Sequence, residues 1–303
     1  MQIKNKIVIH ILATLFLLFS LISKADEFNI SASEISIDKI NNTLIGKGSV
    51  EVDDNEGKII KGNKTIYNKT KKFIIIEGEV EIFDIEGNIL KSDKATYDKS
   101  LGEMISYENS ELITTEGYTI VSNKILYNTI DKIISSNQNS MMTDLDGNKV
   151  MVSMFEYHLE KNLFSSIGKI KIIDINNNTY FFKELHADTK KHEMIGSDVS
   201  VLFDQENFGL SKENEPRFVG NDIFLSKNQS KLSKGVFTVC KQKDDKCPPW
   251  SLQAKEINHD KAKKTIYYTH AILKFYDIPI FYFPKFFHPD PTVKRQSGFL
   301  APF

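Results

Sequence analysis

Apolar and polar side chains alternate along short stretches of this chain from about residue 30 onward. Val50 and Val52 fall on one face of such a stretch, and Glu51 falls on the other. The stretches at Val80–Ile82 and Ile170–Ile172 show the same alternation. A period of two predicts β-strands with one apolar and one polar face. A helical period does not extend over any useful length after residue 25, so we expect an all-β fold.

The alternating stretches themselves recur every 30 residues. Three columns of this repeat are apolar: Val52, Ile82, Leu112, Met142, Ile172 and Leu202; Ile60, Leu90, Ile120, Val150, Tyr180 and Leu210; and Leu44, Ile74, Met104, Ile134, Phe164 and Met194. A further column holds Tyr67, Tyr97, Tyr127 and Tyr157. A turn column holds Gly57, Gly87, Gly117 and Gly147, then Asn177 and Asn207. Gly and Asn adopt positive φ at low cost, so these positions predict hairpin turns in register. Repeats of this length indicate a stacked array, here an open β-solenoid.

The first 25 residues have the pattern of a secretory signal peptide. Lys4 and Lys6 precede an apolar run from Ile7 to Ile22, and small residues stand at Ser23 and Ala25. We therefore expect residues 1–25 to be removed after export. The alternative is an uncleaved membrane anchor, which needs about 20 apolar residues.

The charge balance of the chain argues against a nucleic-acid partner. The 303 residues carry a formal net charge of −1, and residues 1–25 hold three lysines and no acidic residue. The mature chain is therefore more acidic than the whole, whereas nucleic-acid binding needs a basic surface.

The repeats divide the mature chain into a long array and a closing part. We expect residues 26–239 to form the repeats and residues 240–278 to form a closing segment with both cysteines. Ile35 to Ile37 predicts a partial first copy whose edge is open, either frayed or able to add a partner's strand. The phase of the repeat is lost from Asn207 to Gly235, which predicts the closing end of the array.

Cys240 and Cys247 are the only cysteines of the chain. In an oxidising compartment they can pair with each other, which would stabilise the chain by roughly 2–3 kcal/mol. They can instead pair with cysteines outside this chain. A metal site is disfavoured because no other ligand stands at suitable spacing, and no metal is expected.

The end of the chain changes character. Residues 279–303 are rich in aromatic residues and proline, and Pro284, Pro289 and Pro291 cannot donate hydrogen bonds to a strand ladder. They predict a corner or a weakened sheet edge. An apolar end after such a corner is typical of the start of another unit.

Two segments resemble a known family. The repeats, with GEVEIFDIEGNILKSDKATYD as the clearest copy, resemble the OstA-type domain of periplasmic lipopolysaccharide transport proteins over residues 30–210. The tail PIFYFPKFFHPDPTVKRQSGFLAPF resembles the junction that leads from the periplasmic domain into the barrel in the LptD/OstA family. The resemblance assigns this junction to Pro284, Pro289, Pro291, Arg295 and Gly298.

The resemblance implies a fold, a role and a set of partners. The fold is a β-jelly roll of the OstA/LptA type, open on one side, ending at the first strand of a barrel. The role is lipopolysaccharide transport and assembly at the periplasmic face of the outer membrane. The implied partners are lipopolysaccharide, an LptA-like bridge protein that adds a strand near residues 26–52, an LptE-like lipoprotein and the barrel assembly machinery. The family also ties its periplasmic domain to its barrel by disulfides, a part that Cys240 and Cys247 could play.

One departure from the family is large, because its many-stranded C-terminal barrel has no counterpart before Phe303. We expect a fragment, a truncated product or half of a split protein.

A lipid-carrying groove is the expected functional site. An acyl chain costs roughly 0.8 kcal/mol per CH₂ group to hold in water, so carrying it needs a continuous apolar path. The groove candidates are Val52, Ile74, Ile82, Met104, Leu112, Ile134, Met142, Phe164 and Ile172. The competing interpretation is that these side chains fill a closed core.

No catalytic constellation stands out, so we expect no enzymatic activity and no cofactor. Two other functions remain open. A soluble bridge of the LptA/LptC type fits the repeats but not the tail. A β-helical polysaccharide-binding protein would need exposed aromatic rows, whereas the tyrosine column shares its face with inward-pointing residues.

Overall fold

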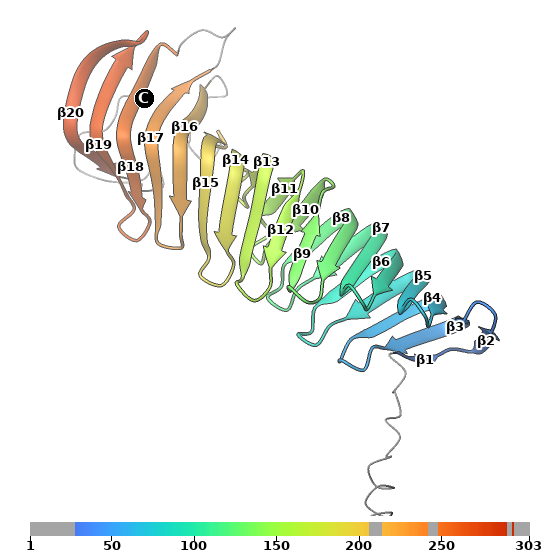
Figure 1. Cartoon of the computed structure of the whole chain (residues 1–303). Coiled ribbons are helices and arrows are strands. Elements are labelled where there is room, and N and C mark those ends of the chain that lie inside the picture. Colours follow the sequence, from blue (N-terminus) through green and yellow to red (C-terminus); the bar gives the residue numbers. More distant parts are fainter. Residues whose placement is uncertain (1–27, 206–213, 242–247, 290–292, 294–303) are drawn as a thin grey trace, which may run out of the picture.

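The computed structural model describes residues 28–205, 214–241, 248–289 and 293. These residues form one antiparallel sheet of 20 strands. The strands stack side by side along an elongated molecule, from β1–β3 at one end to β20 at the other (Figure 1). The expectation of an all-β jelly roll is confirmed.

Each 30-residue copy supplies two antiparallel strands. The strands up to the middle of the sheet are β1 (Asn29–Ser31), β2 (Glu34–Asp38), β3 (Thr43–Asp53), β4 (Ile59–Asn68), β5 (Phe73–Phe83), β6 (Ile89–Asp98), β7 (Glu103–Ile113), β8 (Thr119–Asn128), β9 (Ile133–Ser136) and β10 (Ser140–Thr143). The remaining strands are β11 (Lys149–Val152), β12 (Phe155–His158), β13 (Leu163–Ile173), β14 (Thr179–Asp188), β15 (Glu193–Leu202), β16 (Asn214–Leu225), β17 (Gln229–Cys240), β18 (Trp250–Asp260), β19 (Thr265–Phe275) and β20 (Ile278–Pro289).

Successive strands pair with each other throughout the sheet. Strands β3 to β8 and β13 to β20 each pair with the next along the chain. Three strand positions are split into two half-strands: β1 and β2 both pair with β3, β9 and β10 both pair with β8, and β11 and β12 both pair with β13. Each split falls at the position along the strand where the long strands have a shift in register.

Most long strands have a β-bulge near their middle. The register shifts between Lys47 and Val50, and again between Glu77 and Val80 on β5. Gly48 and Gly78 have φ values of 74° and 81° at these points, which glycine adopts without strain. A bulge bends its strand, so each strand divides into two halves that can face each other.

The two ends of the bent strands come together. A straight strand of 11 residues, such as β5, would span roughly 36 Å at about 3.3 Å per residue. The turns at one end form what we call the first rim, at residues 54–58, 84–88, 114–118, 144–148 and 174–178. The turns at the other end form the second rim, at residues 69–72, 99–102, 129–132, 159–162 and 189–192. Nevertheless, Lys132 Nζ on the second rim lies 3.2 Å from Glu86 Oε1 on the first. The sheet is therefore folded on itself around an apolar interior.

The predicted turn column is correct where the structure describes it. Gly57, Gly87, Gly117 and Gly147 all have φ between 89° and 95°, and Asn177 has φ of 60°. These positive values need glycine or asparagine, as the sequence pattern indicated.

The sheet does not stop at Val239, where sequence analysis places the end of the repeats. Strands β17, β18, β19 and β20 continue the ladder in the same antiparallel order. The connections vary in length after Leu202, those at 203–213 and 241–249 being long and those at 226–228 and 276–277 short, so the period of 30 is lost while hydrogen bonding between neighbours persists. The expected closing segment 240–278 is therefore part of the same sheet.

Candidate functional site

The nine groove candidates all lie in the interior of the folded sheet. Each of them is buried, with at most 8% of its surface exposed. They fall in two rows that cross the strands, one near each rim. The first row contains Val52, Ile82, Leu112, Met142 and Ile172, and the second contains Ile74, Met104, Ile134 and Phe164. Whether they line a lipid path stays a prediction, because in this structure they pack against each other.

Each row contains as many further side chains, which lie on the intervening strands and are absent from the nine candidates. Val52 pairs with Ile60, which pairs with Ile82, so the apolar column beginning at Ile60 alternates with the first. In the same way Tyr97 stands between Ile74 and Met104 in the second row. The 30-residue columns already carried this signal, since consecutive antiparallel strands must interleave two columns in one row.

A small cavity lies between the rows. It has a volume of about 20 Å³, enough for roughly one water-sized group. Its apolar lining includes Ile82, Met104, Leu112 and Ile134, four of the nine groove candidates. Its polar lining comes from Lys58, Asp84 and Asn88 of the first rim and from Tyr127.

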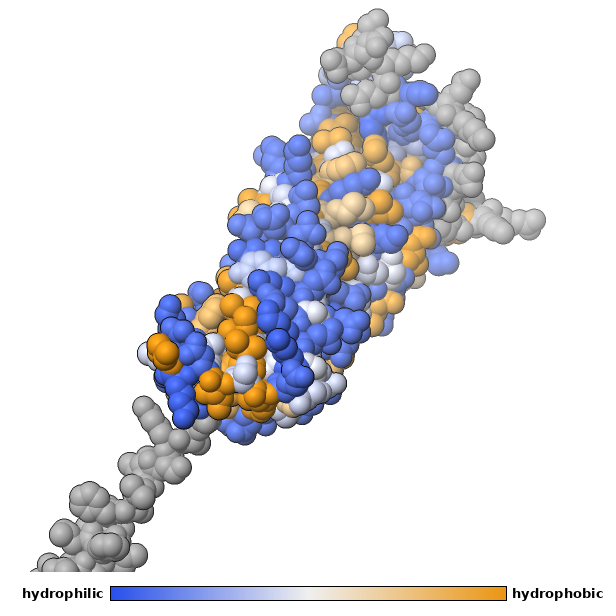
Figure 2. Space-filling view, turned by 90° about the vertical axis from the view of Figure 1, so that its right-hand side faces the viewer, coloured by the Kyte–Doolittle hydropathy of each residue, from blue (hydrophilic) through white to orange (hydrophobic). Residues whose placement is uncertain are grey.

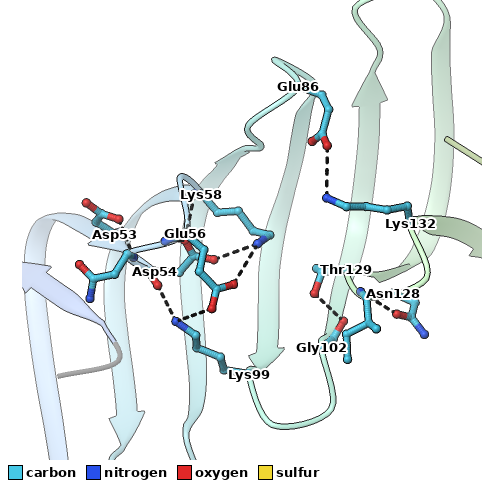
Figure 3. Close-up of polar contacts among 12 residues, drawn as sticks. Asp53, Asp54, Glu56, Lys58, Glu86, Lys99, Gly102, Asn128, Thr129 and Lys132 are labelled. Carbon is cyan, nitrogen blue, oxygen red and sulfur yellow. Dashed lines mark hydrogen bonds and ion pairs between the residues drawn. The ribbon is translucent and has the colours of Figure 1, made fainter. Parts of the chain in front are cut away.

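Polar contacts join the two rims above the interior (Figure 3). Lys99 Nζ lies 3.3 Å from Glu56 Oε1 and donates a hydrogen bond of 2.5 Å to the Asp54 carbonyl oxygen. Lys132 Nζ of the second rim likewise lies 3.2 Å from Glu86 Oε1 of the first rim. We call the Lys99–Glu56 and Lys132–Glu86 pairs the rim bridges. They join the two rims where the ends of the bent strands meet, which we call the mouth of the folded sheet.

A buried ion pair lies beside the first rim bridge. Lys58 Nζ is 3.1 Å from Asp54 Oδ2, and the Asp54 side chain is fully buried. Burial, followed by the nearby Asp54 carboxylate, raises the pKa of the Tyr97 hydroxyl. Removing one member of such a pair would leave an uncompensated charge, which costs several kcal/mol.

The C-terminal strands contribute both buried and partly buried side chains to the interior. Leu185, Val199 and Tyr268 are buried, whereas the following side chains are partly buried and pack on the core: Tyr180, Met194, Phe218, Leu252 and Phe283. Aromatic rings follow one another across this part. Phe218 lies 5.4 Å from Phe203 and 4.7 Å from Phe237, measured between ring centroids. The apolar interior thus continues into the C-terminal strands.

The N-terminal end of the interior is filled by Phe28. Its ring packs edge-on against Tyr67 at 5.1 Å and Tyr97 at 5.7 Å, and Lys99 Nζ lies 5.3 Å from its centroid. Hydrophobic side chains gather at this end of the molecule (Figure 2). They include the exposed Ile35 and Ile37 of the edge strand β2. Sequence analysis expected the open edge but did not identify Phe28, because a single Phe after a leader carries no repeat signal.

The remaining predicted site residues are only partly described. Cys240 is partly buried at the end of β17, whereas Cys247 lies outside the described residues, so their pairing stays a prediction. Pro284 and Pro289 lie on β20, which pairs only with β19 among the described strands and so is an edge there. Pro291, Arg295 and Gly298 lie outside the described residues.

Among the described residues, no group of three His, Cys, Asp or Glu side chains is placed to hold a metal ion. Within the same ranges, no helix has the length and apolar character needed to cross a membrane.

Comparisons with known proteins agree with the resemblance found in the sequence. No protein-family model matches the chain. LPS-assembly protein LptD of Nitrosomonas europaea is 33% identical over 94 residues, 31% of this chain and 12% of the relative. LptD of Nitrosospira multiformis is 31% identical over 98 residues, which are 32% of this chain and 10% of the relative. LptD of Yersinia pestis biovar Antiqua is 33% identical over 126 residues, which are 40% of this chain and 13% of the relative. The matches thus span about a tenth of the length of these relatives.

Among solved structures, the crystal structure of LptH from Pseudomonas aeruginosa resembles part of the chain. It is the LptA homologous periplasmic component of the conserved lipopolysaccharide transport device. It shares 17% identity and a TM-score of 0.33, over 36% of this chain and 82% of that one. The relationship to the LptD/OstA family, which the sequence analysis stated as a resemblance, is confirmed by the LptD matches.

Proposed function

We propose that the interior of the folded sheet carries the acyl chains of lipopolysaccharide during its transport to, and assembly at, the outer membrane. The observation that carries this proposal is the continuity of the two apolar rows. Both rows run without a break from β3 to β13, with one inward apolar or tyrosine side chain on each strand position.

Continuity of this kind suits a lipid better than a core alone. A core needs only enough contact between neighbouring strands, whereas an acyl chain in transit needs shelter at every point, at roughly 0.8 kcal/mol per CH₂ group. The partly buried aromatic and aliphatic side chains from Tyr180 onward extend this shelter along the C-terminal strands. The similarity to LPS-assembly proteins supports lipopolysaccharide as the amphiphile.

The proposal includes an exported protein on the periplasmic side of the outer membrane. Within it, the chain corresponds to the periplasmic domain of an LptD-type protein, and β1 to β3 near residues 26–52 receive a strand of an LptA-like bridge protein. The soluble bridge remains the second candidate, because it would carry the lipid in a folded sheet of the same kind. Membrane fractionation separates them, because a bridge would stay in the soluble fraction.

The polysaccharide-binding alternative is disfavoured by the tyrosine column. Tyr67, Tyr97, Tyr127 and Tyr157 are each at least 95% buried, so they cannot form an exposed row for stacking on sugars.

Photocrosslinking in cells that make lipopolysaccharide tests the proposed path. A photoreactive residue replaces Ile82, Met104 or Ile134, which are buried in the interior, or Met194 on β15, which is partly buried. We expect lipopolysaccharide adducts from these positions, because an acyl chain between the halves would touch them. Matched controls carry the same residue at Glu81 and Lys94, which lie on the outer face and pair with neighbouring charges. Equal labelling inside and outside, or no adduct at any position, would mean that the interior is a closed core.

A further inference from the structure

The tyrosines of the second row differ in how their hydroxyls are satisfied. Tyr157 shares a hydrogen bond of 3.1 Å with Thr189 Oγ1. The Tyr97 hydroxyl interacts with Thr129 and Asp54. Among the described residues, Tyr127 Oη has no hydrogen-bond partner, although its side chain is 95% buried. A buried hydroxyl without a partner costs free energy, so this position needs an explanation.

Tyr127 lines the cavity between the rows, and the other polar groups there are already paired. Both Asp84 oxygens accept hydrogen bonds of 2.7 Å from Asn88, one from its backbone N–H and one from its side-chain amide. Lys58 Nζ is held by the buried Asp54 carboxylate. The group in the cavity that lacks a match is therefore the Tyr127 hydroxyl.

The chemistry of this hydroxyl favours the role of donor. Burial, and after it the negative charges of Asp84 and Glu86, raise the pKa of Tyr127. The phenol therefore keeps its proton over the physiological range, and its O–H group can donate a hydrogen bond to an acceptor. A small oxygen acceptor on an otherwise apolar molecule fits this cavity, because most of its lining is apolar.

We propose that the cavity at Tyr127 is an anchoring subsite for an acyl carbonyl, whose oxygen accepts a hydrogen bond from the Tyr127 hydroxyl while the chain runs along the apolar rows. This inference rests on the proposed function and deepens it, because it assigns one position where the polar end of an amide- or ester-linked chain stops. The chemical class of ligand is an acyl amphiphile, as opposed to a plain alkyl one.

The position of the subsite fits such a ligand. The apolar lining of Ile82, Met104 and Ile134 continues in both directions along the rows. The polar lining of Lys58, Asp84 and Asn88 belongs to the first rim, where a headgroup would leave the interior for water. A carbonyl stands at the boundary between chain and headgroup, which is where Tyr127 lies.

A comparison of two probes with two variants tests the subsite. The probes are sugar amphiphiles with saturated chains of equal length, one joined through an amide and the other through an ether. Binding of each is measured by titration calorimetry, below the concentration at which the probe forms micelles. For Tyr127→Phe in the full chain, we expect the amide-linked probe to bind roughly three- to tenfold more weakly and the ether-linked probe to bind unchanged, since one neutral hydrogen bond is lost.

The matched control is Tyr157→Phe, which removes a hydroxyl that already has a partner. It should lower the melting temperature and leave the ratio of the two affinities as it is in the parent. Tyr127→Phe should leave the melting temperature equal or raised, because it removes an unsatisfied group.

Three results would overturn the subsite. Unchanged amide binding in Tyr127→Phe would make the hydroxyl a bystander, satisfied by water alone. An equal loss for both probes would reduce it to a packing contact. Binding of neither probe by the parent chain would overturn the proposed function as well, which distinguishes the two failures.

Discussion

Single side chains keep the copies of the repeat in step. In three turns of the first rim, an Asp accepts two hydrogen bonds from an Asn four residues later, as in Asp144 and Asn148. The Asn oxygen then accepts a hydrogen bond from the backbone of the next turn, where Asn148 Oδ1 is 3.0 Å from Ile175 N. Asn88 and Asn178 bond in the same way to Thr115 and Asp204. One amide thus satisfies its own turn and the neighbouring one.

We call Asn88, Asn148 and Asn178, which each link their own turn to the next, the Asn ladder. Its contribution to stability can be tested. Asn148→Ala removes the side-chain amide donor to Asp144 and the acceptor of the Ile175 N–H, while the backbone N–H of residue 148 still bonds to Asp144. We expect a loss of roughly 0.5–1.5 kcal/mol in the free energy of unfolding. Denaturant titration measures it. Asn139→Ala, which alters an exposed side chain between β10 and the preceding strand, is the control and should change little. Equal effects of the two substitutions would contradict a specific role for the ladder.

Some of these side-chain environments could be predicted from the sequence, and others could not. The turn glycines and the inward tyrosines follow from periodicity, because each position repeats its own environment. The contact of Asn148 with Ile175 needs knowledge of which turns stack, and the lack of a partner at Tyr127 depends on its exact neighbours. Phe28 and Lys99 could not be paired from the sequence, since they meet only after the sheet has folded on itself.

Strands and turns were predicted in their order but not in their shape. The sequence pattern predicted strands between turns without giving their length, and in the structure most strands have 10 to 12 residues and many bend at a central bulge. The signal was present, because Gly48, Gly78 and Gly168 recur at the bulge positions, all with positive φ. This glycine signal is missing at two equivalent positions, where Glu108 and Asp198 replace glycine and also take positive φ. The C-terminal strands were missed as part of the array because their connections vary in length.

The rim bridges join elements that lie far apart in the sequence, and their contribution can be measured. The Lys132 and Glu86 side chains are 23% and 43% exposed, so a pair of this kind should contribute only about 0.2–1 kcal/mol. We expect a double-mutant cycle of Lys132→Ala and Glu86→Ala to give a coupling in this range at low salt, and less at high salt because of screening. Thermal unfolding at two salt concentrations provides the measurement.

Two comparisons make this cycle decisive. Lys183 and Asp198, an exposed pair between neighbouring strands, provide a matched cycle that does not cross the rims. If the rim bridges hold the mouth closed, breaking Lys132–Glu86 should also increase the photocrosslinking yield at Met104, whereas breaking Lys183–Asp198 should not. An unchanged yield would separate the bridges from access to the interior.

At the scale of the whole molecule, the sheet is built almost entirely from contacts between neighbouring strands. Each strand pairs with the strands directly before and after it, apart from the half-strands. Architectures of this kind behave as linear arrays whose length can change by whole copies. One copy adds two strands, or roughly 10 Å at the usual spacing between strands.

Deletion of one complete copy tests this organisation. Removal of residues 84–113 takes out β6 and β7 and joins β5 to the turn that precedes β8. We expect a folded protein that is shorter by roughly 10 Å, because β5 and β7 occupy equivalent positions. Small-angle scattering and circular dichroism provide the measurements. Removal of residues 84–98 alone is the control and should not fold, since the following strand would then run in the wrong direction. A collapsed 84–113 deletion would show that the copies are not interchangeable.

The line of bulges along the middle of the sheet has a mechanical consequence. The bulges of β3 to β8 lie on one line across the sheet, since the register shifts at the same place in successive pairs. Such a line can act as a hinge, because rotation about it leaves the ladder of each half intact. Opening about it would separate the facing apolar rows and the rim bridges while keeping the hydrogen bonds within each half. The molecule can therefore widen along its length at the expense of side-chain contacts alone.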